Sequence, residues 1–188
     1  MRLTDYSSAK TLQDAVDIIL STTDEHAIAR YNCLLKYAEA CNVIKELGVN
    51  QGSSLAAMMM QGDKTKVVGV DISLDNYKKG GLKELMESYA ADKGFELKLI
   101  QKSSISESTV SNVELLHIDS LHHPKHLMQE LELHAPRVSK YILFHDTKVK
   151  NYELLKVVNK YIESYPQEWE LVENYTGGKC GHAVIKRK

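Results

Sequence analysis

A glycine-containing segment, Glu-Leu-Gly-Val-Asn-Gln-Gly at residues 46–52, carries the strongest chemical signal in the sequence. It lies between an apolar run and a run of small residues, and a second apolar run, 67–70, ends at Asp71. The order strand, glycine turn, helix, strand and terminal acid is typical of a nucleotide-type site in a parallel sheet. Gly48 would let the chain turn off its strand, and Gly52 would bring the helix start close to a ligand. Asp71 is then placed to accept hydrogen bonds from two ribose hydroxyls.

The acid at the front of this segment indicates which ligand fits. A dinucleotide fingerprint reads Gly-x-Gly-x-x-Gly and binds a pyrophosphate, whereas residues 46–52 read Glu-x-Gly-x-x-x-Gly. The carboxylate of Glu46 would repel phosphate and attract an ammonium or a sulfonium group. The segment therefore favours a cationic ligand over a dinucleotide.

A second group of polar residues follows the later apolar runs. Asp119 ends one run, and His145 and Asp146 end the next. Ligands of open parallel sheets bind beyond the carboxyl ends of the strands, where the strand order reverses. These side chains are therefore expected at one site, where His122 or His145 could act as a general base because imidazole titrates near neutral pH.

The elements that would position these residues alternate along the chain. Hydrophobic periodicity predicts an α/β fold, a mostly parallel sheet with helices on both faces. The last two strands have only a short connection, so we expect an antiparallel hairpin at one edge of the sheet. The predicted strands are 43–47, 66–71, 95–101, 113–118, 141–144, 169–175 and 182–186, and the predicted helices are 53–60, 82–92, one opened by Pro124, and 151–164.

About the first 40 residues are predicted to be helical. An apolar stripe runs through residues 12–20 and repeats at 27–41, the pattern of two amphipathic helices. The linker 21–24 supplies N-cap residues for the second helix. Residues 1–42 are therefore assigned as an N-terminal helical cap and residues 43–188 as one compact domain.

Composition limits the class of protein. The chain has 188 residues, a hydrophobic fraction of 43% and a net charge of −1, which gives no reason to expect binding to nucleic acid or to a membrane. Cys33, Cys41 and Cys180 show neither a disulfide framework nor CxxC spacing. No run approaches 18 apolar residues, and no signal segment is evident. We expect a cytoplasmic protein with reduced thiols.

The motif at residues 46–52, together with Asp71, resembles motif I of the class I S-adenosylmethionine (SAM) methyltransferases. That family has a Rossmann-like fold with a seven-stranded, mostly parallel sheet that ends in a C-terminal antiparallel hairpin. The resemblance covers residues 43–186 and leaves the N-terminal helices without a specific match.

Two further segments resemble a small-molecule branch of this family, the cephalosporin hydroxylase/methyltransferase-like and macrolide-sugar O-methyltransferase-like proteins. That branch has Ile-Asp-Gly-x-His before an acid-bearing helix, and residues 118–122 here read Ile-Asp-Ser-Leu-His, with Glu130 as the later acid. The triplet His-Asp-Thr at 145–147 matches the end of strand five in the branch. Ser120 replaces the usual glycine, so the loop conformation there is expected to differ.

The resemblance implies a reaction and its partners. SAM would donate a methyl group to a small-molecule acceptor, with a hydroxyl oxygen as the expected target. Several relatives bind a divalent cation at the ends of strands four and five. If this chain had the same cation site, Asp119 and Asp146 would be its carboxylate ligands. His145 stands where some members have a second acid. Oxygen ligands suit Mg²⁺, and an added histidine favours Mn²⁺, Fe²⁺ or Zn²⁺.

The residues assigned through this resemblance form two sets. Ser103 or Ser104 is expected to meet the adenine of SAM, and Asp119 belongs to both sets. The cofactor-binding set is Glu46, Gly48, Asn50, Gln51, Gly52, Ser53, Asp71, Ile72, Ser103, Ser104 and Asp119, and the catalytic set is Asp119, His122, His145 and Asp146.

Alternatives remain open at this point. A nicotinamide-dependent oxidoreductase, a noncatalytic SAM-binding protein and a metal-dependent hydrolase using the His/Asp cluster fit parts of the pattern. The acceptor site is either open or completed by the N-terminal helices or by a second subunit of a homo-oligomer. His123, His126 and His134 are expected to be solvated helix residues.

Overall fold

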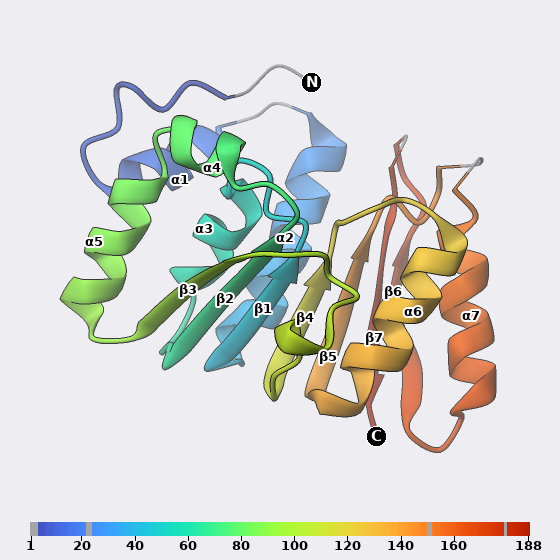
Figure 1. The fold of residues 1–188 in the computed structure, drawn as a ribbon. Helices are drawn as coiled ribbons and strands as arrows, with labels where there is room; N and C mark the ends of the chain where they lie inside the picture. Colours follow the sequence, from blue (N-terminus) through green and yellow to red (C-terminus); the bar gives the residue numbers. More distant parts are fainter. Residues whose placement is uncertain (1–3, 22–23, 150–151, 179) are drawn as a thin grey trace.

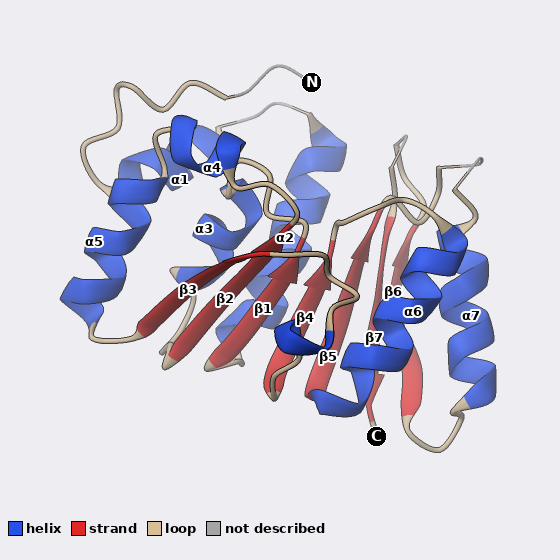
Figure 2. Ribbon diagram, in the orientation of Figure 1, coloured by secondary structure: helices blue, strands red, loops and turns tan. Residues whose placement is uncertain are grey.

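The computed structural model describes residues 4–21, 24–149, 152–178 and 180–188, and it shows one sheet between two layers of helices (Figure 1; Figure 2). The strands are β1 (Val43–Leu47), β2 (Lys66–Asp71), β3 (Glu96–Gln101), β4 (Val113–Ile118), β5 (Val138–His145), β6 (Trp169–Tyr175) and β7 (His182–Arg187). The helices are α1 (Leu12–Leu20), α2 (Glu25–Glu39), α3 (Ser53–Met59), α4 (Asp75–Lys79), α5 (Lys83–Lys93), α6 (Pro124–His134) and α7 (Leu154–Ser164), with 3₁₀ turns η1 (Glu107–Thr109) and η2 (Ala135–Arg137).

The strand order is β3-β2-β1-β4-β5-β7-β6. Strands β1 to β5 pair in parallel, and β7 pairs antiparallel with both β5 and β6. The predicted fold class, with its C-terminal antiparallel hairpin, is therefore confirmed. Because β1 lies between β2 and β4, the strand order reverses there, and the carboxyl ends of β1 and β4 come together.

Each face of the sheet has its own hydrophobic core. Alternate residues of a strand point to opposite faces, so Ile44 packs with residues of α1, α2, α3 and α5, whereas Leu47 packs with residues of α6 and α7. Helices α1 and α2 thus share a core with the sheet. The segment between β3 and β4 carries only η1, so the second face has fewer covering helices (Figure 1).

The helix boundaries follow local capping chemistry. Thr11 caps α1 in a capping box with Asp14, so α1 begins at Leu12. We had predicted that residues 4–10 would also be helical, and this prediction was wrong. Asp24 caps α2 by accepting from the amides of His26 and Ala27, while Thr22 and Thr23 of the predicted linker lie outside the described residues.

Other boundaries shift by a few residues from the predictions. Pro124 opens α6 as predicted. Helix α7 begins at Leu154, and the predicted start at 151 lies outside the described residues. The short helix α4 had no sequence signal that we recognised. Within the described ranges, every helix is too short or too polar to cross a membrane.

Candidate active site

A cleft lies at the carboxyl ends of β1, β2 and β4, where the strand order reverses. Its volume is about 360 Å³. Two of its lining side chains, Ile72 and Leu121, are large apolar groups with exposed fractions of 77% and 62%. Exposed apolar surface in a concave site is what a flat apolar ligand group covers. The cleft is therefore suited to a nucleoside.

The β1–α3 turn forms one wall of the cleft through its backbone. Gly48 has φ +89°, and a Cβ there would lie 2.1 Å from the carbonyl oxygen of Asp119, so only glycine fits. Asn50 has φ 49°, and its amide donates to Oδ2 of Asp71 at 2.8 Å. Oδ1 of Asp71 accepts from the amide of Ser73 at 3.0 Å. These bonds fix the Asp71 carboxylate at the cleft.

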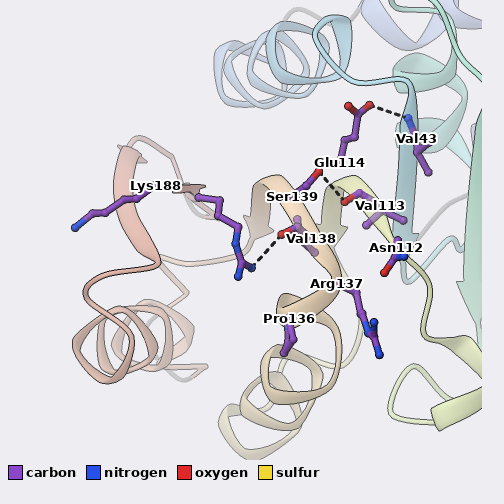
Figure 3. Close-up of a pocket in the computed structure, with 10 residues that line it drawn as sticks. Val43, Asn112, Val113, Glu114, Pro136, Arg137, Val138, Ser139 and Lys188 are labelled. Carbon is purple, nitrogen blue, oxygen red and sulfur yellow. Dashed lines mark hydrogen bonds between the residues drawn. The ribbon is translucent and has the colours of Figure 1, made fainter.

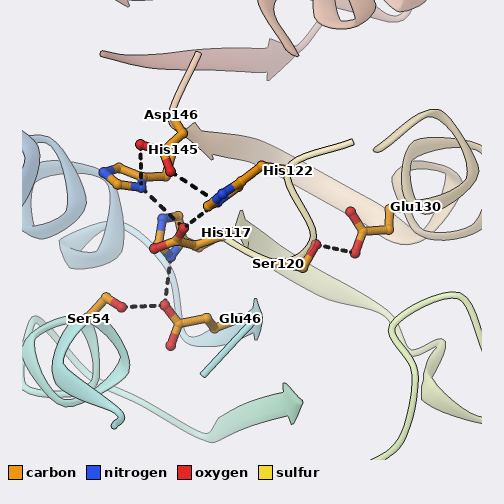
Figure 4. Close-up of polar contacts among 9 residues, drawn as sticks. Glu46, Ser54, His117, Ser120, His122, Glu130, His145 and Asp146 are labelled. Carbon is orange, nitrogen blue, oxygen red and sulfur yellow. Dashed lines mark hydrogen bonds and ion pairs between the residues drawn. The ribbon is translucent and has the colours of Figure 1, made fainter. Parts of the chain in front are cut away.

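Glu46 lies behind this turn and is fully buried. Its Oε1 accepts from Oγ of Ser54 at 2.5 Å and lies 2.8 Å from Nδ1 of His117 (Figure 4). Among the described residues, Oε2 has no hydrogen-bond partner. Burial raises the pKa of Glu46, and the contacts with His117 and Ser54 oppose that rise. The pairing with His117 explains how a histidine is accommodated inside β4.

Four titratable side chains meet at the ends of β4 and β5 (Figure 4). Oδ1 of Asp119 lies 3.1 Å from Nδ1 of His145 and 3.3 Å from Nε2 of His122. The same Nε2 of His122 lies 3.0 Å from Oδ2 of Asp146, and the His122 ring stacks on Tyr152 at 4.9 Å. We call Asp119, His122, His145 and Asp146 the catalytic-end cluster. The structure thus brings the four predicted catalytic residues together.

Charge pairing overrides burial in the catalytic-end cluster. Burial alone would raise carboxyl pKa values and lower imidazole ones. Against its burial, hydrogen bonds with His122 and His145 hold the pKa of Asp119 well below its usual range. Hydrogen bonds with Asp119 and Asp146 outweigh burial and raise the pKa of His145 to about 9. At neutral pH the cluster therefore favours ionised carboxylates beside a protonated His145.

The catalytic-end cluster fits a divalent cation. Each of its four residues offers a ligand atom, and these atoms lie within 4.8 Å of one another. Carboxylate oxygens suit Mg²⁺ or Mn²⁺, and imidazole nitrogens extend the range to Fe²⁺ and Zn²⁺. Two ionised carboxylates also supply the negative charge that such an ion requires.

A buried polar network that we had not predicted supports the far wall of the cleft. Oγ of Ser104 lies 2.9 Å from Nε2 of His126, which lies 3.2 Å from Oε1 of Glu130. Oγ of Ser120 donates to the same oxygen at 2.6 Å. Ser120 therefore anchors its loop to α6.

Of the three histidines that we expected to be solvated, His126 and His134 are not. His126 lines the cleft, and His134 is buried with Nε2 bonded to the carbonyl of Ser104 at 2.7 Å, whereas His123 is exposed as expected. Burial lowers the pKa of His134 to about 4. The sequence carried a signal for this, since positions 127, 130, 131 and 134 recur at the spacing of one buried helix face.

The predicted cofactor-binding residues fall into two groups in the structure. The cleft is lined by Gly48, Asn50, Asp71, Ile72, Ser103, Ser104 and Asp119. Glu46, Gln51, Gly52 and Ser53 are not among the lining residues, and their cofactor roles stay predictions.

The side chains in the second group bond to the N-terminal segment or to neighbouring helices. Oε1 of Gln51 accepts from the amide of Thr4 at 2.9 Å, and Oγ of Ser53 lies 2.7 Å from the hydroxyl of Tyr6. Gly52 has φ +94°, and a Cβ there would meet the ring of Tyr77 at 3.1 Å. The residues before α1 thus cover the start of α3.

A larger hollow, about 640 Å³, lies at the opposite end of the sheet (Figure 3). Two of its charged side chains are engaged locally. Glu114 pairs with Lys140 at 2.8 Å, and Arg187 donates to the carbonyl of Val138 at 3.1 Å. Because it lies at the amino ends of the parallel strands, away from the cluster, we do not assign the active site there.

Fold and site together define a class I SAM-dependent methyltransferase. The chain belongs to the rhamnosyl O-methyltransferase/CmcI family, whose sequence model matches residues 16–181. No curated protein matches the chain. This family membership sets aside the oxidoreductase and hydrolase alternatives.

Solved structures give the same fold at low sequence identity. The N-methyltransferase NodS from Bradyrhizobium japonicum WM9, in complex with S-adenosyl-L-homocysteine, has a TM-score of 0.65 and 10% identity, covering 95% of this chain and 99% of that chain. The SAH-bound methyltransferase PaMTH1 from Podospora anserina has a TM-score of 0.63 and 12% identity, covering 96% and 88%. At such identities the likeness concerns the fold.

Proposed function

We propose that this methyltransferase transfers the methyl group of SAM to a hydroxyl oxygen of a small molecule. The observation that carries the proposal is the position of Asp119, which lines the cleft and also bonds both histidines of the catalytic-end cluster. A donor held in the cleft and an acceptor held at the cluster would meet beside this residue. The family description, which includes a rhamnosyl O-methyltransferase, supports oxygen as the target.

We assign different parts of the SAM molecule to different residues of the cleft and its surroundings. We assign the ribose hydroxyls to Asp71, whose carboxylate the amides of Asn50 and Ser73 already orient. The exposed apolar side chains of Ile72 and Leu121 would cover the adenine faces, and Ser103 or Ser104 would meet its edge. Glu46 is buried, and its Oε2 has no hydrogen-bond partner among the described residues. We assign it to the ammonium group at the amino-acid end of SAM.

Methyl transfer requires little bond-making from the protein. The sulfonium–methyl bond breaks as the oxygen–methyl bond forms, and the acceptor hydroxyl loses its proton. In-line alignment of oxygen, methyl and sulfur is therefore the main contribution of the chain. A divalent cation held by Asp119, His145 and Asp146 would take the place of the proton on His145 and would lower the pKa of the acceptor hydroxyl. His122 lies between both carboxylates, and its hydrogen bond to Asp119, together with the charge of Asp146, raises its pKa. Once a cation engages those carboxylates, His122 is the base that we assign to the proton.

Isothermal titration with SAM tests the cofactor half of the proposal. We expect binding by the wild type, and Asp71→Ala should weaken it about tenfold or more, because hydrogen bonds to a charged group contribute about 1.5–3 kcal/mol. The matched control is Asp92→Ala, which removes an exposed acid on α5. Absence of SAM binding, or an unchanged affinity in Asp71→Ala, would contradict the proposal.

Formation of S-adenosylhomocysteine tests the transfer half. The purified protein is incubated with SAM and a panel of sugars and phenols, with and without a chelator. Turnover on a hydroxylated acceptor supports O-methylation. If chelator leaves the rate unchanged and Asp119→Asn is fully active, the divalent cation is excluded while the transferase assignment stands.

A further inference from the structure

A second cluster of metal-ligating side chains lies outside the cleft. It joins Cys33 of α2, Glu173 of β6 and His182 of β7. One sulfur, one oxygen and one nitrogen atom from these residues lie within 4.8 Å of one another. The three residues come from distant parts of the chain, so the fold assembles them. The proposed methyl transfer does not use them.

The side chains of the second cluster are ordered by their neighbours. Cys33 and His182 are buried, with exposed fractions of 5% and 6%. The His182 ring stacks on Tyr175, with ring centroids 5.0 Å apart and planes at 17°. Its Nε2 lies 3.1 Å from Oε1 of Glu173. A stacked, buried imidazole is held in one orientation, as metal-ligating histidines are.

The two oxygens of Glu173 face different partners. Oε1 faces His182, whereas Oε2 accepts from Nζ of Lys36 at 3.0 Å and from the hydroxyl of Tyr37 at 3.1 Å. Lys36 and Tyr37 therefore orient the carboxylate without occupying the oxygen on the histidine side. The Glu173 side chain is 27% exposed, which leaves a path from solvent.

We propose that Cys33, Glu173 and His182 form a binding site for a borderline-soft divalent cation, with Zn²⁺ as the best match. Thiolate, imidazole and carboxylate together are a zinc-type donor set, and three protein ligands leave one position for water. Mg²⁺ takes oxygen ligands and is disfavoured by sulfur. The cation bridges α2 to the C-terminal hairpin.

Charge and proton balance are consistent with this site. Burial, reinforced by Glu173, raises the pKa of the Cys33 thiol, so the thiol carries its proton until a cation binds. Binding then releases that proton, and the thiolate and the Glu173 carboxylate face the cation with two negative charges, one of which Glu173 shares with Lys36. Burial lowers the pKa of His182 against the pull of Glu173, which favours the neutral imidazole that ligates metals.

Titration of the full chain with Co²⁺ tests the proposal, because a thiolate bound to Co²⁺ adds a charge-transfer absorption that oxygen and nitrogen ligands do not. We expect this band in the wild type and its loss in Cys33→Ser. Cys180→Ser and Asp119→Asn should retain it. They are the controls for the catalytic-end cluster, since Cys180 bonds to Asp146 there. Absence of the band in the wild type, or its retention in Cys33→Ser, overturns the proposal.

A thermal measurement guards against variants that fold poorly. Each protein is melted with and without Zn²⁺, and the shift is compared within that protein, so a lower starting Tm does not matter. Zn²⁺ should raise the Tm of the wild type and of Asp119→Asn. A shift of equal size in Cys33→Ser or His182→Asn would place the cation elsewhere and contradict the site.

Discussion

The two ends of the active site, the cleft and the cluster beside it, are built by different means. At the cofactor end, backbone geometry forms the wall. Gly48 and Asn50 have positive φ, and the amide of Asn50 holds Asp71. At the catalytic end, four titratable side chains hold one another by charge. The cofactor end therefore depends on conformation that few residues can adopt, whereas the catalytic end depends on protonation and would be sensitive to ligand binding.

The two ends touch at Gly48, so we expect its replacement to have the largest effect on both of them. Gly48→Ala should destabilise the fold by about 3 kcal/mol or more, because the new Cβ would lie 2.1 Å from the carbonyl oxygen of Asp119 while φ stays positive. Urea denaturation measures the loss.

Gly94→Ala is the matched control for that change. Gly94 also has positive φ, at +74°, but a Cβ there would meet nothing within 4 Å. It should cost only the backbone strain of about 1–2 kcal/mol. Equal losses in the two variants would show that the contact with Asp119 contributes nothing.

Asp146→Asn separates the two ends functionally. The substitution keeps the side-chain shape, and asparagine tolerates the φ of 56° at this position. Because Asp146 contacts His122 and His145 but does not line the cleft, turnover should fall about 100-fold while SAM affinity stays unchanged. Kinetics and SAM titration on one preparation measure both. A parallel loss of SAM affinity would mean that the ends are not independent.

Much of this comparison could be predicted from the sequence. Asp119 and His145–Asp146 end neighbouring parallel strands, and the carboxyl ends of such strands meet at one edge. Hydrophobic runs located β1, β2, β4 and β5, since buried parallel strands read as apolar stretches. The convergence of the catalytic residues therefore followed from topology alone.

Contacts that depend on register or on loop placement could not be predicted. Glu46 meets His117 because they are paired residues of β1 and β4, and a single sequence does not give that register. His126 was wrongly predicted to be solvated because the β3–β4 segment, with η1 in place of a full helix, packs Ser104 against α6. For His134 the helix periodicity did indicate a buried face, but not its bond to the carbonyl of Ser104. The site of Cys33, Glu173 and His182 joins distant segments with no spacing signal.

The last predicted effect concerns the cofactor end at acid pH. His134 holds the carbonyl of Ser104, which lines the cleft, and its folded pKa of about 4 lies below the ordinary value of 6.5. The unfolded chain therefore takes up this proton first. The contribution of His134 is present above pH 6.5 and is lost as the pH falls toward 4, on the order of 1 kcal/mol per pH unit.

His134→Gln provides the comparison for this effect, because the amide can still donate to the carbonyl of Ser104 but does not titrate. We expect urea denaturation of both proteins between pH 7 and pH 4.5 to show that the free energy of unfolding falls more steeply for the wild type. One proton sets the difference between the two slopes, about 1 kcal/mol per pH unit. SAM affinity of the wild type should weaken over the same range as the Ser104 loop loosens. Parallel stability curves for the two proteins would mean that His134 is not the group through which acid acts on the cofactor end.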